Sequence, residues 1–284
     1  MRFSRAVRLV LQCAALLLAV PPVRLGAAPA ATAAVPRAEH FFYLATWNGL
    51  PVANAELLVQ PGAGGRPDGV VLRGRAETNQ MLDLLWRMRD SVDATVLTDP
   101  IAPRSFVLRQ NENGRRRETT VTAKPPRLLG QVQRRHRKTR QGEVDLHPDL
   151  HDPASIAYLI RTTAGTLDGP RTYEVLTGTK IYTLHVQPAA TETLTVAGRA
   201  WQARRLHLSL DLGYRDVQIA PEQAADDAAR VPERDRERWR ALKIQDADLW
   251  ISTGPERLPL RMRGRTFWGW VTVELSGRDG PPTA

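Results

Sequence analysis

Apolar and polar residues alternate with a period of two through most of the chain. In the stretch 205–211, for example, Leu206, Leu208 and Leu210 alternate with charged or polar residues. This period places successive side chains on opposite faces of a strand, so that one face is buried. It predicts strands near residues 41–47, 51–60, 69–77, 91–97, 104–111, 116–123, 127–134, 171–177, 182–187, 191–197, 205–211, 258–263 and 270–275.

Turn sequences separate many of these segments, among them Asn113-Gly114 and Ala197-Gly198. Short strands joined by turns are typical of antiparallel sheets, and they argue against alternating strand and helix units. We therefore expect an all-β, mostly antiparallel fold with one curved sheet, an open barrel or half-barrel. The sheet forms a single domain over residues 41–277, between a linker at 31–40 and a tail at 278–284.

Two segments are expected to be helical. The first begins with the capping residue Asp152 and with Pro153 at the first helical position, and its apolar residues share one face. We expect this short helix to pack on the sheet, with Ser155 in the cap and Arg161 in a salt link at the surface. The second segment, 221–243, is a polar insertion with nearly balanced charges.

The N-terminal 30 residues have the pattern of a cleaved signal peptide. Arg2, Arg5 and Arg8 precede an apolar run from residue 9 to residue 20, and small residues follow it. The only cysteine of the chain, Cys13, lies inside this run, which excludes a disulfide framework. We expect a periplasmic mature protein without a transmembrane segment.

Positive charge is concentrated in one region of the chain. The 284 residues carry a formal net charge of +10, and the stretch 109–140 holds eleven Lys or Arg but only two Glu. The predicted anionic-surface patch consists of Arg115, Arg116, Arg117, Arg134, Arg135, Arg137, Lys138 and Arg140. It could bind anionic lipid or an envelope polymer, or it could be a solvated hairpin of an arginine-rich protein. We expect no nucleic-acid partner, because export separates the protein from it and few aromatics accompany the patch.

Four segments, taken in order, resemble a known family. They are Tyr43-x3-Trp47-x-Gly49-x-Pro51-Val52-Ala53, the run 89–93, the helix Asp152-x2-Ser155-x2-Tyr158-Leu159-x-Arg161, and the final strands over 250–275. Over residues 40–277 the chain is similar to the exported domain-of-unknown-function family DUF 3108 of the Gram-negative envelope. The resemblance implies a secreted, mostly antiparallel β protein, and it implies no reaction. We expect no cofactor.

Catalytic motifs are scarce. The sequence lacks a Gly-x-Ser-x-Gly elbow and a phosphate-binding loop. His147, Asp149 and His151 supply the ligand types of a zinc site, although the loop also leads into the capped helix. Asp90 and Asp93 could form an acid–base pair or surface ion pairs.

Aromatic residues suggest a different kind of site. The candidates for an apolar ligand site between sheet and helix are Trp47, Trp250, Trp268, Trp270 and Tyr158, although core packing is the more common role of such residues. Three functional hypotheses follow: a non-catalytic envelope protein that binds a lipid-like ligand, lipoprotein or protein partner; a metal-dependent periplasmic hydrolase; and a structural envelope assembly factor.

Overall fold

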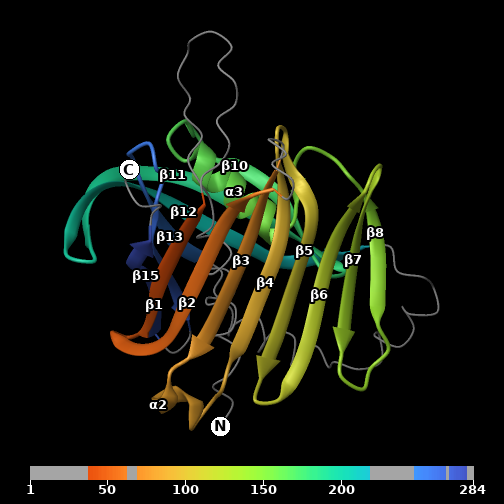
Figure 1. The fold of residues 1–284 in the computed structure, drawn as a ribbon. Coiled ribbons are helices and arrows are strands. Elements are labelled where there is room, and N and C mark those ends of the chain that lie inside the picture. The colour runs from red at the N-terminus through yellow and green to blue at the C-terminus, as the bar shows by residue number, and fades with distance from the viewer. Residues whose placement is uncertain (1–37, 63–68, 218–245, 267–268, 280–284) are drawn as a thin grey trace.

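One curved sheet dominates the computed structural model, which describes residues 38–62, 69–217, 246–266 and 269–279 (Figure 1). Within these residues the sheet has 15 strands in the order β8-β7-β6-β5-β4-β3-β2-β1-β15-β14-β13-β12-β11-β10-β9. Only β9 and β10 pair in parallel. The predicted mostly antiparallel, unclosed curved sheet is therefore confirmed. Successive strands are neighbours because short turns join most of them.

The elements have the following bounds in the structure. They are β1 (Glu39–Trp47), β2 (Leu50–Pro61), β3 (Gly69–Thr78), α2 (Gln80–Asp83), β4 (Arg89–Thr98), β5 (Ile101–Glu112), β6 (Arg115–Lys124), β7 (Arg127–Arg134), β8 (Arg140–Asp145), β9 (Leu150–His151), α3 (Pro153–Thr163), β10 (Arg171–Thr177), β11 (Lys180–Val196), β12 (Arg199–Asp216), β13 (Asp246–Ser252), β14 (Pro259–Thr266) and β15 (Gly269–Asp279). The pattern had not predicted β8, β9, β13 or α2. The expected leader and the polar insertion at 221–243 lie outside the described residues.

Alternation along each strand produces a buried concave face. Val59, Leu72, Ala94, Phe106 and Val121 are paired partners on five successive strands, from β2 to β6. None of them is more than 3% exposed. Rows of this kind form the core, because each removes apolar surface from water on the same side of the sheet.

Helix α3 packs against this core and contacts β4, β5, β9 and β10. Asp152 caps it as predicted: its carboxylate accepts hydrogen bonds from the backbone N–H of Ala154 (2.8 Å) and of Ser155 (2.7 Å). Ile156, Tyr158 and other apolar side chains of the helix are buried. Capping fixes the first turn, and burial of one face holds the rest.

Arg161, near the end of α3, is fully buried, so the expected surface salt link is wrong. Its Nη2 lies 3.2 Å from Glu39 Oε2 on β1 and donates to the backbone carbonyl of Glu256 at 2.8 Å. Its Nε donates to the carbonyl of Arg257, and its guanidinium lies 5.3 Å from the ring centre of Phe41. One side chain thus joins the helix to β1 and to the turn between β13 and β14.

The two edges of the sheet lie near each other. Only residues 146–149 connect the edge strand β8 to the edge strand β9, and such a loop spans at most about 18 Å. Farther along, Gly130 on β7 packs against the turn between β10 and β11, where a Cβ on Gly130 would overlap the carbonyl of Gly178. Glycine at this position allows the two backbones to meet.

Replacement of Arg161 by Met tests the buried ion pair. We expect the free energy of unfolding to fall by about 3–5 kcal/mol, because Glu39 stays buried and keeps only Arg278 as a partner. Urea denaturation measures this change, with the exposed Arg75→Met as the matched control. The double variant Glu39→Gln/Arg161→Met should recover part of the loss, and equal losses in the single and double variants would contradict the pairing.

Replacement of Gly130 by Ala tests the contact between the two arms of the sheet. We expect a loss of about 1–3 kcal/mol in the free energy of unfolding, since the added methyl group forces the backbones apart. Gly277→Ala is the control, because a Cβ there meets only Phe42, with its closest approach an ordinary 3.7 Å. Equal stability of the two variants in urea denaturation would show that the arms do not touch.

Candidate functional site: an arginine cluster at one end of the concave face

The concave face changes from apolar to basic at one end of strands β6 to β8. Arg117 follows the same face as buried Thr119 and Val121 on β6, because the three residues are spaced by two. Its strand partner on β7 is Arg134, and Arg140 on β8 is the partner of Val132. Pairing in register therefore brings three arginines of separate strands to one end of the concave face. Arg117, Arg134, Arg140 and the basic residues around them are called here the arginine cluster.

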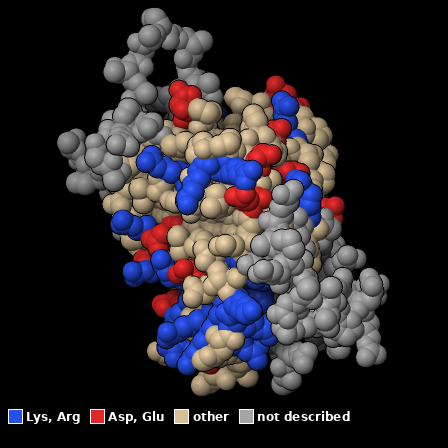
Figure 2. Space-filling view, turned by 90° about the vertical axis from the view of Figure 1, so that its right-hand side faces the viewer, with Lys and Arg blue, Asp and Glu red and all other residues tan. Residues whose placement is uncertain are grey.

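Turn geometry explains why further basic residues gather there. Asn113 and Gly114 both have positive φ, 48° and 76°, as a tight two-residue hairpin requires, and Arg115 begins the next strand. The connection from β7 to β8 returns at the same end. Arg115, Arg116, Arg134, Arg135, Arg137 and Lys138 are exposed. Figure 2 shows Lys and Arg gathered at this lower end of the molecule.

Arg117 differs from its neighbours because its guanidinium is largely buried. Burial lowers its pKa to about 10, and the nearby charges of Arg134 and Arg140 act in the same direction. Its Nε has no hydrogen-bond partner. Among the described residues no carboxylate compensates this charge. The side chain is therefore held in a position where an added anion would be stabilised.

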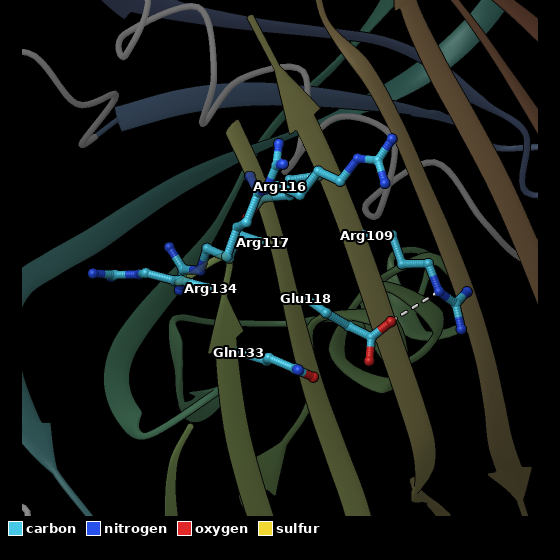
Figure 3. A pocket seen from close by; sticks show the side chains of 8 residues that line it. Arg109, Arg116, Arg117, Glu118, Gln133 and Arg134 are labelled. Atoms are coloured by element: carbon cyan, nitrogen blue, oxygen red, sulfur yellow. Dashed lines mark hydrogen bonds and ion pairs between the residues drawn. The ribbon is translucent and has the colours of Figure 1, made fainter. Parts of the chain in front are cut away.

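A pocket of about 250 Å³ opens at this end of the strands, and its lining includes residues from both faces of the sheet (Figure 3). Its lining residues are Arg109, Gln110, Arg116, Arg117, Glu118, Gln133, Arg134 and Arg135. Glu118 does not neutralise the cluster, because it binds Arg109 at 2.9 Å. Arg109 also binds Asp93, at 2.7 Å. The guanidinium groups of Arg116, Arg117 and Arg135 carry forked donors that suit phosphate or carboxylate oxygens. Sequence reasoning missed Arg109, Gln110 and Gln133, because their place in the pocket depends on strand pairing.

The aromatic candidates do not lie in one pocket. Tyr158 is buried on α3, inside the concave face. Trp250 and Trp270 point to the convex face, because each directly neighbours a core residue on its strand. Trp250 Nε1 donates to Glu192 at 2.5 Å, and the guanidinium of Arg263 lies 4.3 Å from the ring centre of Trp270. Trp47 on β1 is partly buried, and Trp268 lies outside the described residues.

The metal-ligand candidates have other partners in the structure. His147 Nε2 lies 3.2 Å from Glu174 Oε2, whereas His151 is 1% exposed and packs edge-on against Tyr173, with ring centres 5.8 Å apart. In the part of the chain that the structure describes, no group of three or more His, Cys, Asp or Glu could hold a metal ion. His147, Asp149 and His151 thus do not form the ligand set that their spacing suggested.

Asp90 and Asp93 are on opposite faces of β4, since they are three positions apart in a strand. Asp90 accepts a hydrogen bond from the backbone N–H of Asn111 at 3.0 Å, and Asp93 pairs with Arg109 on the convex side. They therefore cannot act on one substrate atom as an acid–base pair.

Fold and site together define a class: a curved, unclosed β-sheet wrapped on one helix, with a basic end. The chain belongs to the family described as "Protein of unknown function (DUF3108)", whose model matches residues 43–276. A search of the curated proteins finds no match. Among solved structures, the chain is similar to a β-barrel-like protein of domain of unknown function DUF1849 from Brucella abortus, with a TM-score of 0.50 and 8% identity. The likeness covers 87% of this chain and 99% of the other, and it concerns the fold alone.

Of the helices that the structure describes, none has the length and apolar character needed to cross a membrane.

Two buried titratable side chains at the start of α3, His151 and Asp152, make the free energy of unfolding change with pH in opposite directions. Burial raises the pKa of Asp152 to about 6, although Ser155 and Ala154 donate hydrogen bonds to it. Burial lowers the pKa of His151 to about 4. As pH rises from 4 to 6, the stabilising contribution of Asp152 is lost, because the folded chain keeps a proton that the unfolded chain releases. The contribution of His151 instead increases, because only the unfolded imidazole is protonated below about 6.5.

Asp152→Asn leaves the effect of His151 unopposed. Relative to the native chain, we expect the free energy of unfolding of this variant to fall by an additional 2–3 kcal/mol, roughly, between pH 6.5 and pH 4. His151→Phe should show the opposite relative change, and urea denaturation across pH 4–7 measures both. Parallel pH profiles for the native chain and the two variants would contradict this assignment.

Proposed function

We propose that this protein is a non-catalytic cell-envelope protein that binds an anionic partner through the basic end of its concave face. The observation that carries the proposal is Arg117: a largely buried guanidinium, without a carboxylate partner among the described residues, beside Arg134 and Arg140. An anion seated there would relieve the repulsion between these cations and offset the cost of their burial.

The surroundings favour a multivalent ligand. The pocket is lined by Arg116, Arg117, Arg134 and Arg135, which come from two adjacent strands and from the turn that follows them. Forked guanidinium groups spread over this surface match a ligand with several phosphate or carboxylate groups better than a single small anion. The partner classes that fit are phosphorylated envelope polymers and anionic lipid headgroups.

The other hypotheses lack a comparable observation. A hydrolase built on His147 and His151 gains no support, since the first pairs with Glu174 and the second is buried against Tyr173. A lipid-like ligand between sheet and helix gains none from α3, whose apolar face packs into the core.

Arg117→Gln/Arg134→Gln tests the anion site. Calorimetric titration with inorganic pyrophosphate should show salt-sensitive binding to the native chain, and affinity at least about tenfold lower in the double variant, because two charge-assisted hydrogen bonds are lost. Arg75→Gln, on the exposed convex face, is the matched control.

A stability measurement separates binding from folding. In the absence of a ligand, Arg117→Gln should leave the free energy of unfolding unchanged or raise it, because the variant removes a buried charge next to other cations. A destabilised variant that binds pyrophosphate like the native chain would assign Arg117 a structural role and contradict the proposed function.

A further inference from the structure

We propose that the anionic partner is a phospholipid bilayer, and that the protein docks on it by inserting exposed apolar side chains beside the arginine cluster. This inference rests on the proposed function and names the partner of that site. The inserted set, called here the apolar rim, consists of Leu50, Met81, Leu84, Leu85 and Trp270.

The apolar rim stands out by its exposure. Leu84 is 87% exposed, Leu85 76%, Met81 75% and Leu50 67%. Only six large apolar side chains of the described residues are exposed, and five of them belong to the rim; the sixth, Tyr214, is covered by the ammonium group of Lys180, 3.1 Å from its ring centre. Apolar groups gathered at one place on an otherwise well-packed protein mark a surface that binds something.

Hydrogen bonds bring the rim residues together from three parts of the chain: the α2 segment, the start of β2 and the start of β15. Asn79, the cap of α2, donates from its side chain to the carbonyl of Pro51 at 2.7 Å, which places α2 beside the turn between β1 and β2. Asn48 in that turn donates to the carbonyl of Trp270 at 2.8 Å and accepts from the N–H of Trp270 at 2.8 Å. The α2 segment and the turn between β1 and β2 lie at the lower end of the sheet in Figure 1.

The rim continues directly into the arginine cluster. The N–H of Asn113 donates to the carbonyl of Arg87 at 2.9 Å, and the N–H of Arg87 donates to the side chain of Asn113 at 2.8 Å. Asn113 begins the turn that leads to Arg115, and the N–H of Arg135 meets the carbonyl of Arg116 at 3.4 Å. Apolar and basic groups therefore share one continuous end of the molecule.

The segment 80–85, which contains α2 and carries three rim residues, is fixed by hydrogen bonds to the sheet. Asp83 at the end of α2 accepts hydrogen bonds from Thr78 (2.5 Å) and from Arg89 (3.0 Å), and Arg89 lowers the pKa of its carboxyl group. Trp86, next to the rim residue Leu85, is buried. The leucines thus stay outside while the segment that bears them is anchored in the fold.

Charge favours a bilayer over a second copy of this chain. Two copies that met through the rim would bring two arginine clusters together, and this like-charge contact is unfavourable. An anionic bilayer instead presents phosphates to the arginines and acyl chains to the leucines, the arrangement of proteins that lie at a membrane interface. Trp270 beside the Arg263 guanidinium has the composition typical of residues at that interface.

Vesicle sedimentation tests the proposal. The native chain should sediment with vesicles of phosphatidylglycerol and phosphatidylethanolamine and not with pure phosphatidylcholine. Leu84→Ser/Leu85→Ser should reduce partitioning about tenfold or more and leave pyrophosphate affinity unchanged, because it removes apolar insertion only. Lys124→Gln, at the opposite end of β6, should behave like the native chain. Circular dichroism verifies that each variant is folded.

A second measurement locates the contact. In a chain with Cys13→Ala, an environment-sensitive dye on Leu84→Cys should shift to the blue with anionic vesicles, whereas the dye on Lys124→Cys should not. Vesicle binding that is insensitive to the leucines, or an unshifted dye at position 84, would overturn the proposal. A native dimer that the leucine variant separates in sedimentation velocity would also overturn it.

If pyrophosphate binding persists in these cases, the proposed function stands and only the bilayer is excluded. If pyrophosphate does not bind while vesicle binding depends on Leu84, the anion site fails and the bilayer contact stands.

Discussion

The buried ion pair between Arg161 and Glu39 is the constraint on which the rest of the structure depends. A buried guanidinium needs charge and hydrogen bonds in place of its hydration, and here one carboxylate and two backbone carbonyls bind its Nε and Nη2. Arg278 on β15 approaches the same carboxylate at 3.4 Å. The groups that satisfy Arg161 come from β1 and from the turn before β14, so the helix can occupy only one position on the concave face.

The position of the helix decides where a ligand can bind. Because the buried side chains of α3 belong to the same core as Phe41, Phe106 and the other inward residues of the sheet, the apolar part of the concave face is already used for folding. The polar part lies at the end of β6 to β8, just beyond the contact between Gly130 and Gly178. A binding function is therefore expected at an end of the sheet and not under the helix.

At the basic end of the sheet, several features are energetically unfavourable for the isolated protein. Arg117 is desolvated near other cations, and four apolar side chains from two neighbouring connections face water. Each feature weakens the isolated protein slightly, and both would be relieved by one partner that offers phosphates and hydrocarbon together. The family and the structural neighbour establish the fold, whereas the chemistry of this end supports the proposal about binding.

Local patterns in the sequence determined most of the strands, the antiparallel class, the capped helix at Asp152 and the basic run, because alternation, capping and charge act between near neighbours in the chain. Tertiary structure decided that Arg161 is buried and that Trp250 and Trp270 face away from Tyr158. It pairs His147 with Glu174 and buries His151 against Tyr173. It also decided that the leucines after Asn79, which resemble core residues in the sequence, remain outside. These outcomes depend on which strands pair and how the sheet curls, and alternation assigns each side chain to a face without specifying what lies opposite it.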